Sequence, residues 1–330
     1  MHIMILGAAG MIGRKLCERL ARAGNISGTE ITKLTLVDVV PPSAPADAAA
    51  EVESITSDPS QNGEAQRLIK ARPDVVFHLA AIVSSDAEAN FEKGYRVNLE
   101  GSHRLFEAIR LEGGSAPYRP RVVFTSSLAV FGRPLPDEIP DDFVLAPLSS
   151  YGTQKAICEL LLADYSRRGF FDGIALRLPT ICVRPGKPNK AASGFYSAII
   201  REPLLGEEAV LPVSKELRHW FASPRSAVGA LIHAASIDLR ELGSRRSVNL
   251  PGVSATVGDQ IEALRRVAGD PAVNLIREVP DPVVLEIVSS WPRAFTAERA
   301  KRLGFTAESS MDEIIRVHID DEQGGSLDQR

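Results

Sequence analysis

Three residues near the middle of the chain combine side-chain types and spacing that could move a proton. Tyr151 and Lys155 stand four positions apart in a predicted helix, Tyr151–Arg168, so their side chains share one helical face. A tyrosine with its reference pKa of ~10 is a poor base at pH 7, but a neighbouring cation stabilises its anion. Ser127 follows a strand-like run, Arg121–Thr125, and could hydrogen-bond a substrate oxygen that gains charge. These residues predict alcohol or ketone chemistry with Tyr151 as the base, and they require no metal.

A glycine-rich turn near the N-terminus could hold the partner in such a redox reaction. The strand-like run Ile3–Leu6 leads into Gly7-Ala8-Ala9-Gly10-Met11-Ile12-Gly13, and a helical pattern continues to Ala23. Gly7 permits the tight turn, Gly10 lets the backbone approach a pyrophosphate, and Gly13 lets the helix pack closely on the strand. The free N–H groups of the helix start favour phosphate. The turn therefore predicts a dinucleotide site.

Acidic residues at the next two strand ends bear on which dinucleotide binds. Asp38 ends the strand-like run Leu34–Val37, where a carboxylate can accept hydrogen bonds from both adenosine ribose hydroxyls and would repel a 2′-phosphate. Val39 and Val40 follow, so no basic side chain stands there to bind the 2′-phosphate of NADP, and the sequence favours NAD. Asp58 follows a weaker strand, Val52–Ile55, and is either an adenine contact or a solvated loop residue.

The elements that must position these residues alternate between strands and helices. Further strands are predicted at Val75–Leu79, Arg121–Thr125, Ile174–Leu178 and Ser247–Leu250, and further helices at Gln66–Ala71, Val97–Leu111, Ser223–Ser236, Ala255–Ala268 and Ser310–Ile319. Apolar strands separated by such helices predict an α/β, Rossmann-like doubly wound parallel sheet. Prolines interrupt the chain after Leu178, which indicates a smaller, irregular α/β C-terminal lobe. We therefore expect an NAD-binding domain at 1–178, with 223–250 returning to it, and a substrate-binding lobe at 179–222 and 251–330.

Composition excludes several other classes of protein. The 330 residues carry 38 Lys+Arg and 42 Asp+Glu, a formal charge of −4, so neither a nucleic acid nor a membrane surface is expected as a partner. The cysteines Cys17, Cys158 and Cys182 lie far apart in apolar stretches, which predicts core residues rather than zinc ligands or disulfides. No signal-peptide pattern opens the chain and no apolar run approaches ~20 residues, so a cytoplasmic location is predicted.

Taken in chain order, these motifs resemble the extended short-chain dehydrogenase/reductase family over nearly the whole sequence. The matching pieces are Gly7–Gly13, Asp38, His78-Leu79-Ala80-Ala81, Asn98 in Arg96–Gly101, Thr125-Ser126-Ser127 and the Tyr151/Lys155 pair. The resemblance implies that Ser127, Tyr151 and Lys155 are catalytic and that NAD is the cofactor. It further implies that the cofactor meets Gly7, Gly10, Met11, Ile12, Gly13, Asp38, Asp58, Leu79, Ala80, Ala81, Asn98, Thr125, Tyr151, Lys155, Pro179, Thr180 and Ile181. Phe131 departs from the family pattern, where Tyr is common, and removes no catalytic group.

Two runs look like one group of the family, the D-erythronate dehydrogenases: Arg177–Lys190 and Arg218-His219-Trp220. The resemblance implies oxidation of D-erythronate at C2. A carboxylate substrate also fits the basic segment that contains Arg184, Lys187 and Lys190. Arg184 is the better anchor because a guanidinium can bind a carboxylate through two parallel hydrogen bonds. The alternative is that this segment is a solvated basic loop without substrate contact. Arg218 and Arg225 are rival anchors.

Four smaller predictions complete the expected site. Ser84 stands where related threonine dehydrogenases place a substrate-binding serine, and Ser193 is a weaker candidate for substrate contact. His78 ends an apolar strand and is expected to be a core histidine. His219 could line the substrate pocket.

Three other functions stay open. A nucleotide-sugar 4-epimerase uses the same catalytic set but retains its NAD. L-Threonine dehydrogenase has a zwitterionic substrate. A non-enzymatic NAD(H)-sensing protein would often lack the tyrosine or lysine that this chain has. The family resemblance also implies a homodimer, through the helices around Val97–Leu111 and Tyr151–Arg168.

Overall fold

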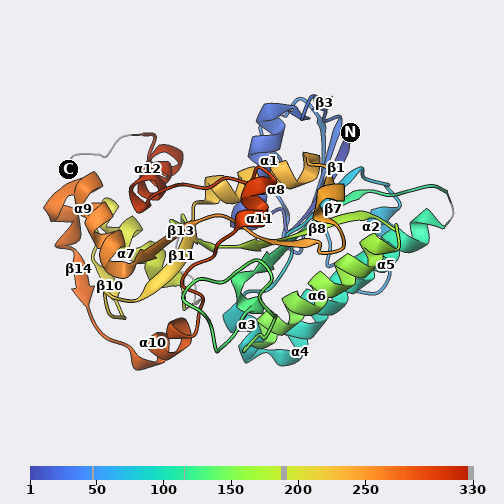
Figure 1. The fold of residues 1–330 in the computed structure, drawn as a ribbon. Coiled ribbons are helices and arrows are strands. Elements are labelled where there is room, and N and C mark those ends of the chain that lie inside the picture. The colour runs from blue at the N-terminus through green and yellow to red at the C-terminus, as the bar shows by residue number, and fades with distance from the viewer. Residues whose placement is uncertain (47, 115, 187–191, 326–330) are drawn as a thin grey trace. The chain divides into compact units, whose positions relative to one another are not determined.

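The computed structural model describes residues 1–330 except 47, 115, 187–191 and 326–330 (Figure 1). The described chain forms two compact units. The first unit comprises residues 1–130, 147–177 and 228–248, and the second comprises 131–146, 178–227 and 249–330.

A seven-stranded sheet forms the centre of the first unit, in the order β12-β8-β7-β6-β1-β4-β5. The strands are β1 (His2–Leu6), β4 (Lys33–Asp38), β5 (Glu51–Thr56), β6 (Val75–His78), β7 (Arg121–Ser127), β8 (Asp172–Leu178) and β12 (Ser247–Asn249). The pairs β4–β5, β1–β4, β1–β6 and β6–β7 are parallel. The residues of β1, β4, β6 and β7 are almost all buried, as expected for strands covered on both faces, whereas β5 at the sheet edge has no buried residue. The predicted Rossmann-like α/β sheet is confirmed.

Helices cover this sheet and carry its connections. They are α1 (Met11–Ala23), α2 (Glu64–Ile69), α3 (Ser84–Ala89), α4 (Phe91–Gly94), a π-helical turn η1 (Tyr95–Glu100), α5 (Gly101–Gly113), α6 (Ser150–Arg167) and α8 (Pro224–Ser236), whose start lies in the second unit's range. Short elements are β2 (Asn25–Ile26), β3 (Thr29–Glu30), and the 3₁₀ turns η2 (Leu128–Val130) and η3 (Leu239–Leu242). In Figure 1, α2, α5 and α6 lie together on one side of the sheet and α1 lies on the other. Leu16 and Leu20 of α1 are buried at helical spacing, as the sequence predicts.

The second unit is built on a small sheet and its own apolar core. The sheet order is β13-β11-β9, and a separate pair is β10-β14. The elements are β9 (Thr180–Ile181), α7 (Gly194–Leu204), β10 (Ala209–Leu211), β11 (Arg218–Ala222), β13 (Val253–Thr256), α9 (Val257–Val273), β14 (Ile276–Glu278), α10 (Pro282–Ser289), α11 (Glu298–Arg302) and α12 (Met311–Glu322). Tyr196, Phe221, Leu264 and Ile315 are fully buried in the core between them.

Two features of the second unit differ from the expectation. The segment after Leu178 is more regular than its prolines suggest, because α7 continues through Pro203. Pro203 is the second-last residue of α7, which ends at Leu204. Residues 131–146 group with the second unit although they follow η2 of the first unit directly, and Ile139 forms a parallel bridge with Phe295. Within the described residues, no helix is both long and apolar enough to cross a membrane.

Candidate active site

The glycine turn between β1 and α1 is shaped so that side chains would not fit. Gly7 has φ +89°, and a Cβ there would lie 2.7 Å from the Ala80 backbone nitrogen at the end of β6. A Cβ on Gly13 would overlap the Gly7 carbonyl oxygen, so this glycine is what lets α1 pack against the turn. Both positions therefore require glycine for close backbone approach, as predicted.

The start of α1 offers an anion a free set of N–H groups. Gly10 is the N-cap of the helix, no side chain caps it, and its first turn contains no acidic residue. Gly10 is exposed, and a Cβ there would meet Gly7 O at 3.3 Å. A helix N-terminus of this kind favours phosphate through its partial positive charge. These features fit the pyrophosphate of a dinucleotide.

Asp38, the last residue of β4, lies against this turn. Its Oδ2 accepts a hydrogen bond from Ala9 N at 2.9 Å, and Oδ1 accepts one from Val40 N at 3.4 Å. The carboxylate is thus fixed beside the glycine turn, where the predicted contact with the adenosine ribose requires it.

Asp58 lies in a network of its own beyond β5. It accepts hydrogen bonds from Ser60, from Gln61 and from Arg96 at 3.1 Å. Burial works to raise the pKa of Asp58, but these hydrogen bonds outweigh it and the pKa lies below its usual value. Asp58 is therefore an ionised acceptor with several protein partners.

Asn98 in η1 holds the chain that follows β6. Its Oδ1 accepts from Ile82 N at 2.9 Å, and its Nδ2 donates to Ile82 O and to Gln154 Oε1. These bonds fix the segment directly after Leu79-Ala80-Ala81. Gln154, fully buried on α6, is a partner that sequence reasoning missed.

The predicted catalytic residues lie at the end of β7 and the start of α6. Ser149 caps α6 by accepting from Gly152 N at 3.1 Å, which begins the helix just before Tyr151. The Lys155 ammonium donates to the Thr125 carbonyl at 2.7 Å and lies 5.7 Å from the centre of the Tyr151 ring. Ser127, two residues beyond Thr125, accepts from Ala129 N at 3.2 Å. The structure thus brings the tyrosine and lysine together beside the strand end that carries Ser127.

Burial sets the protonation of the neighbouring groups. It lowers the pKa of Lys155 to about 8, because the ammonium is removed from water. Burial, aided by the Lys155 charge, lowers the pKa of His78 to about 3. His78 is therefore neutral at pH 7, and its Nε2 lies 2.8 Å from Ser102 Oγ. This is the core histidine that the sequence predicts.

The second unit contains the predicted residues Thr180 and His219. Thr180 Oγ1 lies 2.6 Å from His219 Nε2, and His219 Nδ1 lies 3.0 Å from Pro292 O. Burial lowers the pKa of His219 to about 4, so the ring is neutral at pH 7. A carbonyl can only accept, so Nδ1 carries the proton and the Thr180 hydroxyl donates to Nε2. His219 is buried and does not line the pocket described below.

Arg184 and Ser193, two predicted substrate contacts, bind each other. Arg184 Nη2 donates to Ser193 Oγ at 3.1 Å, and Nε donates to Ile181 O at 3.0 Å. The guanidinium is thereby held in one orientation beside a buried hydroxyl. The rival cations Lys187 and Lys190 lie outside the described residues.

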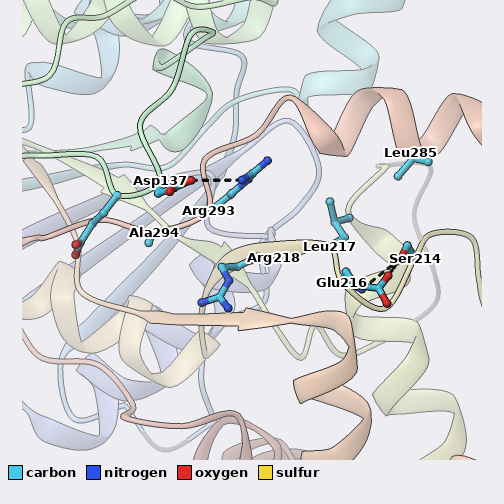
Figure 2. A pocket seen from close by; sticks show the side chains of 9 residues that line it. Asp137, Ser214, Glu216, Leu217, Arg218, Leu285, Arg293 and Ala294 are labelled. Atoms are coloured by element: carbon cyan, nitrogen blue, oxygen red, sulfur yellow. Dashed lines mark hydrogen bonds and ion pairs between the residues drawn. The ribbon is translucent and has the colours of Figure 1, made fainter.

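A pocket of about 620 Å³ opens in the second unit (Figure 2). It is lined by Asp137, Glu138, Ser214, Glu216, Leu217, Arg218, Leu285, Arg293 and Ala294. Arg218 is exposed on β11 and is drawn apart from the Asp137–Arg293 pair in Figure 2. Arg225, the other rival anchor, is paired with Asp321 at 2.5 Å. Ser84 starts α3 and is half-buried.

The three cysteines are free and buried. Among the described residues, no group of three or more His, Cys, Asp or Glu side chains could hold a metal ion.

Comparison with known proteins agrees with this geometry. The NAD dependent epimerase/dehydratase family model matches residues 3–224. A D-erythronate dehydrogenase of Cupriavidus necator is 50% identical over 325 residues, 97% of this chain and 98% of the relative. One of Haemophilus influenzae is 42% identical over 320 residues, 97% of this chain and 99% of the relative.

Solved structures show the same fold. One described as a nucleoside-diphosphate-sugar epimerase from Agrobacterium tumefaciens has a TM-score of 0.98 and 63% identity, covering 99% of this chain and 96% of its own. An L-threonine dehydrogenase from Cupriavidus necator has a TM-score of 0.83 at 23% identity, covering 97% and 99%, and shows the fold alone. The cofactor of the family is NAD. The chain therefore belongs to the NAD dependent epimerase/dehydratase family, the extended short-chain dehydrogenases/reductases that its motifs predict.

Proposed function

We propose that the protein oxidises D-erythronate at C2 to 2-dehydro-D-erythronate with NAD as the acceptor. The observation that carries the proposal is the set of Ser127, Tyr151 and Lys155 at the end of β7 and the start of α6. The two D-erythronate dehydrogenases, 50% and 42% identical over nearly the whole chain, support this substrate.

The chain's own residues have separate tasks in this reaction. NAD, when bound, supplies the acceptor for the hydride that leaves C2. Tyr151, as the tyrosinate that the Lys155 cation stabilises, takes the proton of the C2 hydroxyl and becomes the neutral phenol. Ser127 hydrogen-bonds the same substrate oxygen and steadies it as it becomes a carbonyl.

Cofactor contacts follow the turn and the strand ends. We propose that Gly7, Gly10 and Gly13, with the N–H groups of Met11 and Ile12, hold the pyrophosphate. Asp38 holds the adenosine ribose, and Asp58 faces the adenine. The further proposed contacts are Leu79, Ala80, Ala81, Asn98, Thr125, Tyr151, Lys155, Pro179, Thr180 and Ile181.

The substrate carboxylate is assigned to Arg184. Its guanidinium is oriented by Ile181 O and the Ser193 hydroxyl, and a fixed planar fork loses little freedom when it grips a carboxylate. Ser193 and Ser84 are the proposed hydroxyl contacts. Arg218 is the rival anchor because it is exposed in the pocket of Figure 2. On this assignment the first unit supplies most of the NAD contacts and the catalytic residues, and the second supplies the carboxylate anchor.

The assembly and location that the family resemblance implies also remain proposals. We propose a homodimer through the helices around η1, α5 and α6, where Leu111 and Leu160 expose 52% and 65% of their surface. Light scattering should give twice the chain mass, and a monomer at micromolar concentration would contradict this.

The proposed location is the cytoplasm, where the three free cysteines would stay reduced.

A substrate panel tests the reaction. NADH formation is followed with D-erythronate, L-threonate, D-threonate, L-threonine and UDP-galactose. We expect turnover with D-erythronate, and we expect Tyr151→Phe to abolish it while NADH affinity changes by less than about twofold. A Tyr151→Phe variant that retains substantial turnover would contradict the assigned base.

Nucleotide-sugar epimerisation is the second candidate, favoured by the structure from Agrobacterium tumefaciens at 63% identity. It predicts conversion of the nucleotide sugar without net NADH release, and NAD retained through purification. If no acid in the panel is oxidised, and either the nucleotide sugar is converted or NAD is retained, epimerisation would replace the proposed reaction.

A further inference from the structure

A buried ion pair lies directly behind the catalytic residues. Glu159 on α6 and Arg177 on β8 form a two-point contact, with Nε–Oε1 at 2.9 Å and Nη2–Oε2 at 2.6 Å. Their side chains are 2% and 8% exposed. Ser126 Oγ donates to Glu159 Oε1 at 2.5 Å. The carboxylate therefore connects α6 with two neighbouring strands, β7 and β8.

Fold stability alone is a weak reason for such a pair. Removing two charges from water offsets most of their attraction, and apolar residues of similar volume are often equally or more stable in such places. The position of the pair points to another role. Tyr151, Lys155 and Glu159 stand at positions i, i+4 and i+8, so they share one face of α6.

Two successive residues of β7 are tied to this face of α6. Lys155 bonds the carbonyl of Thr125, and Glu159 bonds the hydroxyl of Ser126. The next residue is Ser127. The helix that carries the base and the strand end that carries the proposed oxygen contact are thus joined at two points, one of them reinforced by Arg177.

We propose that Glu159 and Arg177 are positioning residues for the reaction: they fix α6 against the end of β7, and so place Tyr151 and Lys155 relative to Ser127. This inference rests on the proposed function, because it assigns the network a role in that same site.

The groups around Lys155 indicate that Glu159 also affects the charge of this ammonium. The titratable groups facing Lys155 are His78 from β6 and Tyr151, Cys158 and Glu159 from α6. His78 is neutral, and burial raises the pKa of the Cys158 thiol, so that thiol is neutral as well. Burial lowers the pKa of Lys155, and Glu159 works to raise it, as Cys158 does in its thiolate form. Loss of Glu159 would therefore let Lys155 lose its proton at lower pH.

The test replaces the pair without leaving a buried charge. In Glu159→Leu/Arg177→Met both charges are removed together, and Ser126→Ala removes one hydrogen bond while keeping the pair. The matched control is Arg121→Met, which removes an ion pair of 3.1 Å with Asp172 between the opposite ends of the same two strands and leaves Asp172 its second partner, Arg246. Each protein is measured for Tm, NADH affinity, and the pH profiles of kcat and KM with D-erythronate.

We expect the double variant to lose roughly tenfold to hundredfold in kcat, since small misplacements of reacting groups have effects of that size. Its alkaline limb should move to lower pH, with NADH affinity kept within about twofold. Ser126→Ala should show a smaller loss of kcat, and the control should alter Tm alone. Wild-type kcat and pH profile in Ser126→Ala and the double variant would overturn the inference, whatever their Tm. If the double variant does not fold, Ser126→Ala decides.

The outcome is separable from that of the proposed function. Turnover of D-erythronate by the wild type, with unchanged variants, refutes the positioning role alone. Absence of that turnover, with conversion of UDP-galactose, refutes the proposed reaction, and the same variants are then compared on the sugar.

Discussion

Lys155→Met should make the protein inactive and more stable at the same time. The lysine is buried, and its pKa falls from 10.5 to about 8. A shift of roughly 2.5 units corresponds to ~3 kcal/mol, at about 1.4 kcal/mol per unit. Below pH 8 the folded protein must hold a charge that the unfolded chain holds more easily, so this amount destabilises the native state.

The substitution also removes favourable contacts. The Thr125 carbonyl loses its 2.7 Å donor, which costs about 1–2 kcal/mol, and the ammonium no longer lies 4.6 Å from the centre of the Phe124 ring. The net expectation at pH 7 is a gain of ~1 kcal/mol in the free energy of unfolding. Turnover should be lost, because the phenol of Tyr151 loses the cation beside it.

The pH dependence makes this prediction decisive. As pH rises above the folded pKa of about 8, the folded lysine releases its proton while the unfolded lysine keeps its own, so the penalty shrinks with pH and is gone above 10.5. The advantage of Lys155→Met should therefore shrink by ~2 kcal/mol between pH 7 and pH 9.5 in denaturant titrations. Lys93→Met, at an exposed lysine of α4, is the control and should show a small difference without this trend. The reasoning would be refuted if Lys155→Met were less stable than the wild type at pH 7 and less stable by the same amount at pH 9.5.

Two further predictions concern the cofactor. Gly13→Ala should weaken NADH binding by at least roughly tenfold in a fluorescence titration, since its Cβ would overlap the Gly7 carbonyl and push α1 away from the turn. Gly229→Ala, where a Cβ meets nothing within 4 Å, is the control and should bind NADH normally. Asp38→Ser should lower the preference for NAD over NADP in kcat/KM, because the carboxylate that repels the 2′-phosphate is gone. An unchanged preference would mean that Asp38 does not contact the ribose.

Local patterns were enough to predict the parts of the site that depend on neighbouring residues. The contacts of Gly10 and Gly13 lie within the turn itself, and the Tyr151/Lys155 spacing follows from one turn of helix. The buried strands could likewise be predicted, because short continuous apolar runs in a chain of this composition are typical of strands covered on both faces.

Contacts between distant segments could not be predicted. Arg177 is a charged residue inside the apolar run Ile174–Leu178. A charge in a buried strand indicates an acidic partner, but the sequence does not identify which acid it is. The pairing of Asn98 with Gln154 and the grouping of 131–146 with the second unit depend on tertiary packing in the same way. Pro203 was misleading, because a proline pattern does not reveal where a helix ends.

The order of the strands has a consequence for how the protein is made. The sheet of the first unit places β12, from residues 247–249, at the edge beside β8, whereas the glycine turn at residues 7–13 is synthesised more than 230 residues earlier. Until residue 249 has emerged, β8 is an open sheet edge, able to pair with strands of other nascent chains. A fragment ending at residue 178 would keep that edge permanently. Folding of the nucleotide-binding sheet is therefore completed only after residue 249 has been synthesised, and chains truncated before it should aggregate rather than form a stable sheet.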